Sequence, residues 1–197
     1  MIKLPDKKYN IIYVDPPWEY PDQDKRLGGS HGQHGIALGV GTYYKTMTLD
    51  ELSQMEIPSN KDCWIFMWAT ATKLPDAINL IDRWGFTYWT CAVWDKVHLG
   101  LGWFFRVQHE ILIVGKKGHP KCPVVKNRSI FVEKRTTHSK KPICVRIWID
   151  KAFPSAMKLE LFARQRYAGW DTWGDEVSDT VQHNLNIEGG KTPFTTK

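Results

Sequence analysis

The chain has 197 residues, a length that suits one globular domain with a buried core. Its 42% hydrophobic and 24% charged residues are ordinary for a folded domain, and no apolar run approaches the roughly 20 residues of a membrane-spanning helix. The polar start of the chain contains no apolar segment of signal-peptide type, so we expect a cytoplasmic protein with no membrane partner.

The net charge of +6 is concentrated in one segment. Residues 106–151 hold 12 Lys and Arg against 3 Asp and Glu, a net of +9, whereas the remainder holds 15 against 18, a net of −3. A basic block beside a nearly neutral body is typical of proteins that contact phosphates, although a solvated basic face has the same composition. The ten tryptophans fit either a Trp-rich core or a protein that handles nucleobases.

The first predicted elements lie before Gly85. A buried strand is expected over 9–15, because this apolar run ends abruptly at two prolines that cannot continue a ladder. A long glycine-bearing loop follows over 19–42, and Thr48 to Glu51 form a capping box that predicts a short helix. We then expect a strand over 63–68 and a helix over 74–84 that ends at Gly85.

The second half continues the alternation of strands and helices. Strands are expected over 86–94, 110–115, 129–132 and 157–162, with a loop over 95–109 and a helix from Pro142 to about Phe153. This alternation predicts an α/β fold with a mainly parallel sheet, whose ligands bind at the carboxyl ends of the strands. Residues 1–177 are expected to form a single domain, and the polar segment 178–197 a flexible tail.

The four cysteines lie far apart and contain no C-x-x-C pair, which indicates neither a disulfide framework nor a zinc knuckle. His119 and Cys122 are spaced like one pair of metal ligands, but no second pair accompanies them. We therefore expect no metal site.

Asp15, Pro16, Pro17 and Trp18 follow the first predicted strand directly, where an α/β sheet places its active site. Such a turn suits methylation of adenine, whose exocyclic nitrogen is a poor nucleophile because its lone pair is delocalised into the ring. The Asp15 carboxylate and the Pro16 carbonyl can accept hydrogen bonds from its two N–H groups, and the prolines fix both acceptors by holding φ near about −65°. Trp18 offers a ring on which an extruded base can stack.

The alternative is an ordinary turn at the end of a strand, with Trp18 as a core anchor. The buried strand before this tetrapeptide and the long glycine-bearing loop after it are the context that the catalytic interpretation requires.

Separated motifs along the chain carry a family resemblance. In order, they are Asp15-Pro16-Pro17-Trp18, Tyr44-x-Thr46-Met47, Trp94-x-Lys96, Arg106-x-x-His109-Glu110, Gly115-x-Lys117-Gly118, His138-Ser139-Lys140-Lys141-Pro142, Lys158 to Arg164, Gly169-Trp170 and Trp173-Gly174. In these motifs the chain resembles the MT-A70 family of adenine methyltransferases, from about Tyr9 to Val177. The resemblance implies a Rossmann-like class I methyltransferase sheet, circularly permuted so that the catalytic motif precedes the cofactor motif.

The resemblance also implies a cofactor, S-adenosylmethionine, and a division of the site. The cofactor-binding residues expected from it are Asp15, Lys141, Glu160, Phe162, Arg164 and Asp175. The substrate-binding residues expected from it are Trp18, Tyr44, Lys96, Arg106 and Glu110.

Among the cofactor residues, Lys141 suits the methionine carboxylate, Phe162 the adenosyl group, and Glu160 and Arg164 the ribose and the methionine end. Phe162 could instead belong to the core, and Glu160 could form a plain surface pair with Arg164. Asp175 departs from the family, which often has Asn there; a carboxylate can accept from ribose hydroxyls but cannot donate.

Nucleic acid is the expected partner, with DNA favoured over RNA because the chain is compact and resembles the prokaryotic members of the family, which act mainly on DNA. The chain has no room for a separate target-recognition domain. Recognition is then short or relaxed, or a homodimer or partner subunit supplies more of it. Phosphate contacts are expected from Lys116, Lys117, Lys121, Lys126, Arg128, Lys134, Arg135 and Lys140.

Three alternatives stay open at this point. The chain could be an RNA adenosine methyltransferase or a subunit of a heterodimeric one, an inactive scaffold subunit, or a non-catalytic nucleic-acid-binding module. The intact Asp15-Pro16-Pro17-Trp18 argues against the scaffold. A dinucleotide-dependent oxidoreductase is disfavoured, because no G-x-G-x-x-G follows a predicted strand.

Overall fold

The computed structural model describes residues 4–20, 46–100, 104–135, 140–174, 177 and 181–182. The helices are α1 (Leu49–Ser53), the 3-10 turn η3 (Ala71–Lys73), α2 (Leu74–Arg83) and α3 (Ile143–Ala152). The strands are β1 (Tyr9–Val14), β2 (Ser59–Ala69), β3 (Thr87–Asp95), β4 (His109–Lys117), β5 (Ile130–Val132), β6 (Lys158–Leu161), β7 (Arg166–Tyr167), β8 (Asp171–Trp173) and β9 (Val181–Gln182).

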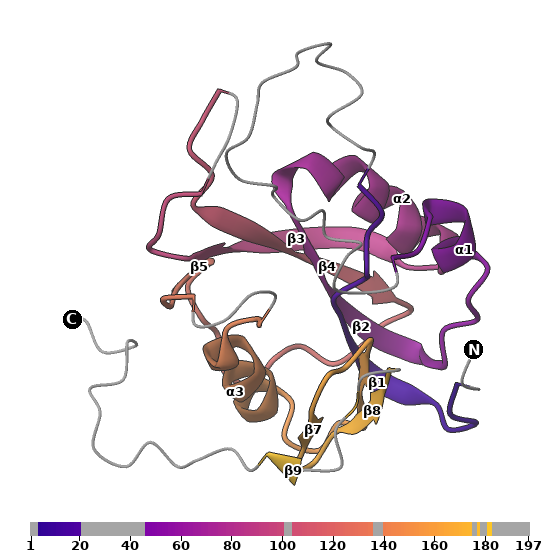
Figure 1. Ribbon diagram of the computed structural model, residues 1–197. Coiled ribbons are helices and arrows are strands. Elements are labelled where there is room, and N and C mark those ends of the chain that lie inside the picture. Colours follow the sequence, from indigo (N-terminus) through magenta and orange to yellow (C-terminus); the bar gives the residue numbers. More distant parts are fainter. Residues whose placement is uncertain are drawn as a thin grey trace.

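Seven of these strands form one sheet, in the order β5-β3-β4-β2-β1-β6-β8, with helices on both faces (Figure 1). Parallel pairing joins β1 to β2 and β6, β6 to β8, and β3 to β5, whereas β4 runs antiparallel to β2 and β3. The expected α/β class with a mainly parallel sheet is confirmed. The circular permutation stays a prediction, although β6 does follow β1 in the chain and lie beside it.

The reversed direction of β4 places its first residues at the same edge as the carboxyl ends of β1, β2 and β3. The register fixes this arrangement, because Glu110 of β4 pairs with Trp94 near the end of β3, and Ile111 pairs with Ala69 at the end of β2. The residues that follow β1, β2 and β3 and the residues that begin β4 therefore lie along one edge of the sheet. We call it the active-site edge.

The chain segments that leave β1 and β6 run in opposite directions across the sheet, so the connections diverge between these two strands. The chain proceeds from β1 to β2 on one side and from β6 to β8 on the other, and this reversal of strand order is where α/β sheets bind their ligands. Asp15 follows β1 directly and Phe162 follows β6 directly, so the sheet topology brings these two predicted site residues to neighbouring strand ends.

β1 is buried on both sides, which holds its end rigidly. Ile12 and Val14 pack into the cluster that includes α1 and α2, while Ile11 and Tyr13 pack into the cluster that includes α3. Burying one such aliphatic side chain contributes roughly 1.5–3 kcal/mol. The strand that presents Asp15 is thus among the most firmly anchored parts of the molecule.

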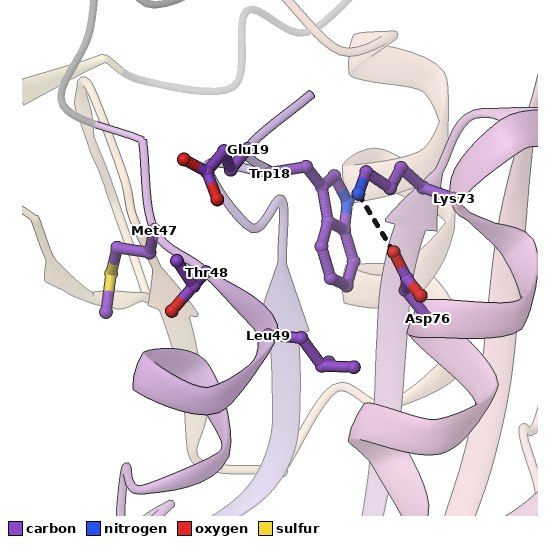
Figure 2. Close-up of a pocket in the computed structure, with 7 residues that line it drawn as sticks. All are labelled: Trp18, Glu19, Met47, Thr48, Leu49, Lys73 and Asp76. Carbon is purple, nitrogen blue, oxygen red and sulfur yellow. Dashed lines mark hydrogen bonds and ion pairs between the residues drawn. The ribbon is translucent and has the colours of Figure 1, made fainter. Parts of the chain in front are cut away.

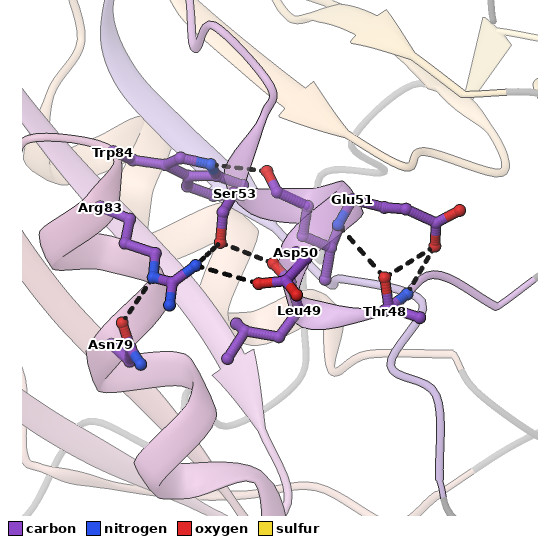
Figure 3. A network of polar contacts seen from close by, with 9 residues as sticks. Thr48, Leu49, Asp50, Glu51, Ser53, Asn79, Arg83 and Trp84 are labelled. Atoms are coloured by element: carbon purple, nitrogen blue, oxygen red, sulfur yellow. Dashed lines mark hydrogen bonds and ion pairs between the residues drawn. The ribbon is translucent and has the colours of Figure 1, made fainter.

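The capping box at Thr48 is confirmed. The Glu51 N–H donates to the Thr48 hydroxyl over 3.2 Å, and the Thr48 N–H donates to the Glu51 carboxylate over 2.8 Å. Figure 3 shows how α1 is joined to α2, because Arg83 contacts Asp50 and Ser53 of α1 over 3.2 Å each. The Trp84 indole N–H also donates to a carbonyl of α1, over 2.9 Å. These contacts fix the segment that precedes α1.

One sequence expectation differs from the structure, and two others are almost wholly untested by it. The strand over 157–162 was expected to be the last clear one, yet β8 extends the sheet beyond it. A three-residue strand is too short to show any periodicity, so only its pairing with β6 reveals it. The loop expected over 19–42 and the tail over 178–197 fall almost wholly outside the described residues. No helix in the described ranges is long and apolar enough to cross a membrane.

Candidate active site

The Asp15-Pro16-Pro17-Trp18 turn is braced by backbone hydrogen bonds. The Trp18 N–H donates to the Pro16 carbonyl over 2.8 Å, a γ-turn that suits the fixed φ of Pro17 at its centre. The Met47 N–H donates to the Pro17 carbonyl over 2.8 Å, and the Glu19 N–H donates to the Met47 carbonyl over 3.1 Å. The turn is therefore tied to the segment before α1. The Pro16 carbonyl keeps a second lone pair for a further donor.

Trp18 is anchored in the core and also borders a cavity. Its side chain is 6% exposed, and its indole N–H points at the Trp68 carbonyl at the end of β2, over 3.4 Å. A cavity of about 370 Å³ lies between this ring, the segment before α1 and the start of α2, where Lys73 pairs with Asp76 over 2.9 Å (Figure 2). Trp18 is therefore buried as the core-anchor alternative expects, and it also lines a cavity.

Four charged side chains alternate in sign along the active-site edge. Lys141 Nζ lies 2.9 Å from the Asp15 carboxylate and 3.0 Å from the Glu110 carboxylate, and Lys96 Nζ lies 3.3 Å from the other oxygen of Glu110. These residues come from the ends of β1 and β3, the start of β4 and the segment before α3. The structure therefore unites predicted cofactor residues with predicted substrate residues in one network.

Burial and ion pairing act differently on each member of this network. Burial raises the pKa of Asp15 above its usual value and outweighs the opposing attraction of Lys141. For Glu110 burial also acts to raise the pKa, but Lys141 and Lys96 outweigh it and lower the pKa. Burial alone would lower the pKa of Lys141, yet Asp15 and Glu110 raise it. The same lysine thus pairs with one carboxylate whose pKa is raised and one whose pKa is lowered.

Glu160 of β6 is held by a residue that sequence analysis missed. The guanidinium of Arg146 in α3 donates a hydrogen bond to each of the two carboxylate oxygens of Glu160, one of them over 2.8 Å. The guanidinium lies 3.7 Å from the ring centre of Tyr167 and 5.3 Å from that of Trp170, and its pKa is raised, because burial is outweighed by Glu160. The sequence signal that could have indicated this pair is the position of Arg146 on the apolar, inward face of the predicted helix.

Phe162 and Arg164 follow β6 at the divergence point. Phe162 has a φ of +57°, a left-handed conformation that costs a non-glycine residue roughly 1–2 kcal/mol, and its ring meets Trp173 edge-on at 5.3 Å. Its core alternative is partly borne out, since it packs against the core cluster. Arg164 is close enough to Asp15 to act electrostatically on its pKa, in the lowering direction.

Among the remaining predicted site residues, the structure describes Arg106 alone and places it outside this network. Arg106 lies in the β3–β4 connection, where its Nε donates to the Gly100 carbonyl over 2.7 Å. Tyr44 and Asp175 lie outside the described residues, as do His138 and Ser139 of the sixth motif.

A sheet of this strand order, with one antiparallel strand and a braced carboxylate where its connections diverge, is that of a Rossmann-like methyltransferase. Comparison with known sequences gives the narrower assignment. The chain belongs to the MT-A70 family, which it matches over residues 9–176. The resemblance inferred from separated motifs is therefore confirmed.

Three relatives illustrate the range of this similarity. The type II methyltransferase M.MunI of Mycoplasma sp is 39% identical over 90% of this chain and 81% of its own length. The N6-methyladenosine RNA methyltransferase MTA1 of Cryphonectria parasitica is 28% identical over 91% of this chain and 55% of its own. The N(6)-adenosine-methyltransferase MT-A70-like protein of Arabidopsis thaliana is 25% identical over 86% and 24% respectively. The chain thus spans most of the mycoplasmal protein but about half or less of the other two.

Proposed function

We propose that this chain uses S-adenosylmethionine to methylate the exocyclic amino group of adenine in DNA. The observation that carries the proposal is the Asp15 carboxylate, held 2.9 Å from Lys141 where β1 and β6 diverge. The choice of DNA is supported by the similarity to a type II methyltransferase over most of that protein's length, at higher identity than to the RNA methyltransferase.

The residues at the divergence point fit the chemistry of the cofactor. S-adenosylmethionine supplies an electrophilic methyl group on a sulfonium, and carries a carboxylate, an ammonium and two ribose hydroxyls that need partners. Lys141 and Arg164 offer cations suited to the carboxylate, while Asp15 and Glu160 offer acceptors for the ammonium and the hydroxyls. Glu160 keeps accepting capacity beyond its two bonds to Arg146, because each carboxylate oxygen has two lone pairs.

The catalytic role follows from the fixed acceptors. The Asp15 carboxylate and the Pro16 carbonyl accept the two N–H groups of the adenine amine and so localise its lone pair for attack on the methyl carbon. Bound S-adenosylmethionine would supply the methyl group, with S-adenosylhomocysteine as the leaving group, and the methylated nitrogen would release one proton to solvent. Because the acceptors are in place beforehand, no reorganisation of the turn is needed during the reaction.

Distance from the active-site edge separates the lysines and arginines proposed to contact phosphates into a near and a far group. Lys116 and Lys117 end β4 and lie roughly 20 Å or more from its start at the active-site edge, since a strand rises about 3.3 Å per residue. Lys134 and Arg135 are exposed beside the end of β3, where the Arg135 N–H donates to the Lys96 carbonyl over 3.4 Å. We assign phosphate contact near the reacting base to Lys134, Arg135 and the exposed Lys140.

The test is incubation with isotopically labelled S-adenosylmethionine and matched DNA and RNA oligonucleotides, single- and double-stranded, followed by mass identification of the product nucleoside. We expect N6-methyladenine in DNA. Asp15→Ala is expected to abolish turnover while cofactor binding, measured by calorimetry, persists. Asp82→Ala, which removes an exposed carboxylate from α2, is the matched control and is expected to leave turnover unchanged.

Methylation of RNA alone would replace DNA as the substrate. Undiminished turnover by Asp15→Ala would remove Asp15 from the mechanism. A chain that binds DNA yet gives no calorimetric signal with the cofactor would be a non-catalytic binding module.

A further inference from the structure

The described residues of the connection between β3 and β4, 96–100 and 104–108, form two arms of a hairpin that continue past the end of β3 (Figure 1). The Lys96 N–H donates to the Gln108 carbonyl over 2.8 Å, and the Gly100 N–H donates to the Val107 carbonyl over 2.7 Å, so the two arms stay paired. At its base the Asp95 carboxylate accepts from the Val97 N–H over 2.8 Å and from the Gln108 side chain over 2.9 Å. This part of the hairpin is therefore internally braced.

The hairpin exposes apolar side chains. Phe104 is 95% exposed and Phe105 is 83% exposed. On the opposite arm, Val97 is 50% exposed and Leu99 is 59% exposed. Single exposed apolar residues are ordinary, but a group on one element marks an interaction surface. Val97 also has a φ of +65°, which is uncommon for a β-branched residue and sets the course of the arm at its base.

The base of the hairpin is part of the active site. Lys96 begins the hairpin and its Nζ lies 3.3 Å from Glu110, which pairs in turn with Lys141 beside Asp15. Gly100 is four residues beyond Lys96, so this arm reaches at most about 14 Å from the network. That reach is close to the roughly 12 Å width of the major groove of B-DNA. The exposed aromatics therefore belong to a hairpin whose base is part of the charge network of Asp15.

We propose that Phe104 and Phe105 enter the base stack of duplex DNA next to the target adenine and replace its stacking contacts when it is extruded. The inference rests on the proposed function. An adenine inside a duplex cannot reach Asp15, so its neighbours must lose a stacking partner, and inserted apolar side chains serve this purpose in proteins that kink or open DNA.

The surroundings of the hairpin favour a polyanion over a protein partner. Arg106 follows the two phenylalanines directly, and Lys134 and Arg135 lie exposed where the 133–135 segment runs along the hairpin base, through hydrogen bonds to the Asp95 and Lys96 carbonyls of 3.2 and 3.4 Å. The carboxylates near the base are all engaged, Asp95 by hydrogen bonds within the hairpin, Glu110 by Lys96 and Lys141, and Glu133 by the first N–H groups of α3. Apolar side chains flanked by cations are complementary to DNA, in which stacked bases lie between two rows of phosphates.

The test compares the wild-type chain with the double variant Phe104→Ala/Phe105→Ala. The matched control is Ile78→Ala/Met157→Ala, which removes two exposed apolar side chains elsewhere. Because all four side chains are exposed, each variant is expected to keep the wild-type Tm. On fully paired duplex DNA, the kcat/KM of the phenylalanine variant is expected to fall about ten- to a hundred-fold. On the same duplex with an abasic site opposite the target adenine, the loss is expected to shrink to about two-fold, because that adenine is already unpaired.

A second readout does not depend on methyl transfer. Permanganate oxidises unstacked thymines, so the thymine left opposite an extruded adenine becomes reactive in duplex bound by the wild-type chain but not in duplex bound by the phenylalanine variant. An equal loss of kcat/KM on both duplexes would overturn the inference in favour of a protein or second-copy contact, and no loss on either would also overturn it. A wild-type chain that methylates nothing would sink the proposed function alone, because the permanganate pattern would still test the hairpin.

Discussion

The pair formed by Arg146 and Glu160 allows a stability prediction whose magnitude follows from burial. The two side chains are only 7% and 13% exposed and are joined through both carboxylate oxygens. Removing one partner of a buried pair leaves an uncompensated charge and costs about 3–5 kcal/mol. We therefore expect Arg146→Met to lower the free energy of unfolding by that amount, while Arg146→Met/Glu160→Gln, which leaves no charge behind, recovers at least about half of the loss.

The assay is urea unfolding of wild type, both single variants and the double variant, followed by tryptophan fluorescence. The three aromatic rings around the guanidinium, those of Tyr13, Tyr167 and Trp170, add a contribution that the double variant does not restore, so full recovery is not expected. A loss below about 1 kcal/mol in Arg146→Met would mean that solvent screens the pair. Additive single effects would mean that the two residues are not coupled.

Three further outcomes are expected. Because burial raises the pKa of Asp15, and its ionised form is the stronger acceptor for the N–H groups of substrate and cofactor, turnover should fall on the acid side at a pH above the ordinary carboxyl value of about 3.9; a pH–rate profile without such a limb would contradict this. Gly174→Ala should destabilise the chain by about 1–3 kcal/mol in urea unfolding, because the new Cβ would lie 2.4 Å from the Ala163 carbonyl oxygen, and an unchanged unfolding midpoint would refute the close contact. Alanine variants at 134–135 should reduce the slope of log affinity for DNA against log salt by about 0.9 per lost phosphate contact, whereas alanine variants at 116–117 should leave the slope unchanged.

Much of the fold was accessible from local sequence. The buried strand before the prolines, the capping box at Thr48 and the end of α2 before Gly85, whose φ is +78°, all lie where the sequence predicts them. Each depends on interactions between residues a few positions apart, such as a capping hydrogen bond or the steric freedom of one glycine. The family resemblance likewise came from motifs that are contiguous in the chain.

What the tertiary structure alone decided is the set of contacts between distant segments. The sequence placed Lys96, Glu110 and Lys141 among the site residues, but only the reversed direction of β4 brings them into one charge network with Asp15. β8 is a strand only because β6 offers it an edge, and Arg146 of α3 has a carboxylate partner only because the fold brings Glu160 of β6 to it. Sequence therefore determined the elements and the chemistry they carry, because those depend on near neighbours. Strand order and register determined which of these groups meet, because they depend on the packing of the whole sheet.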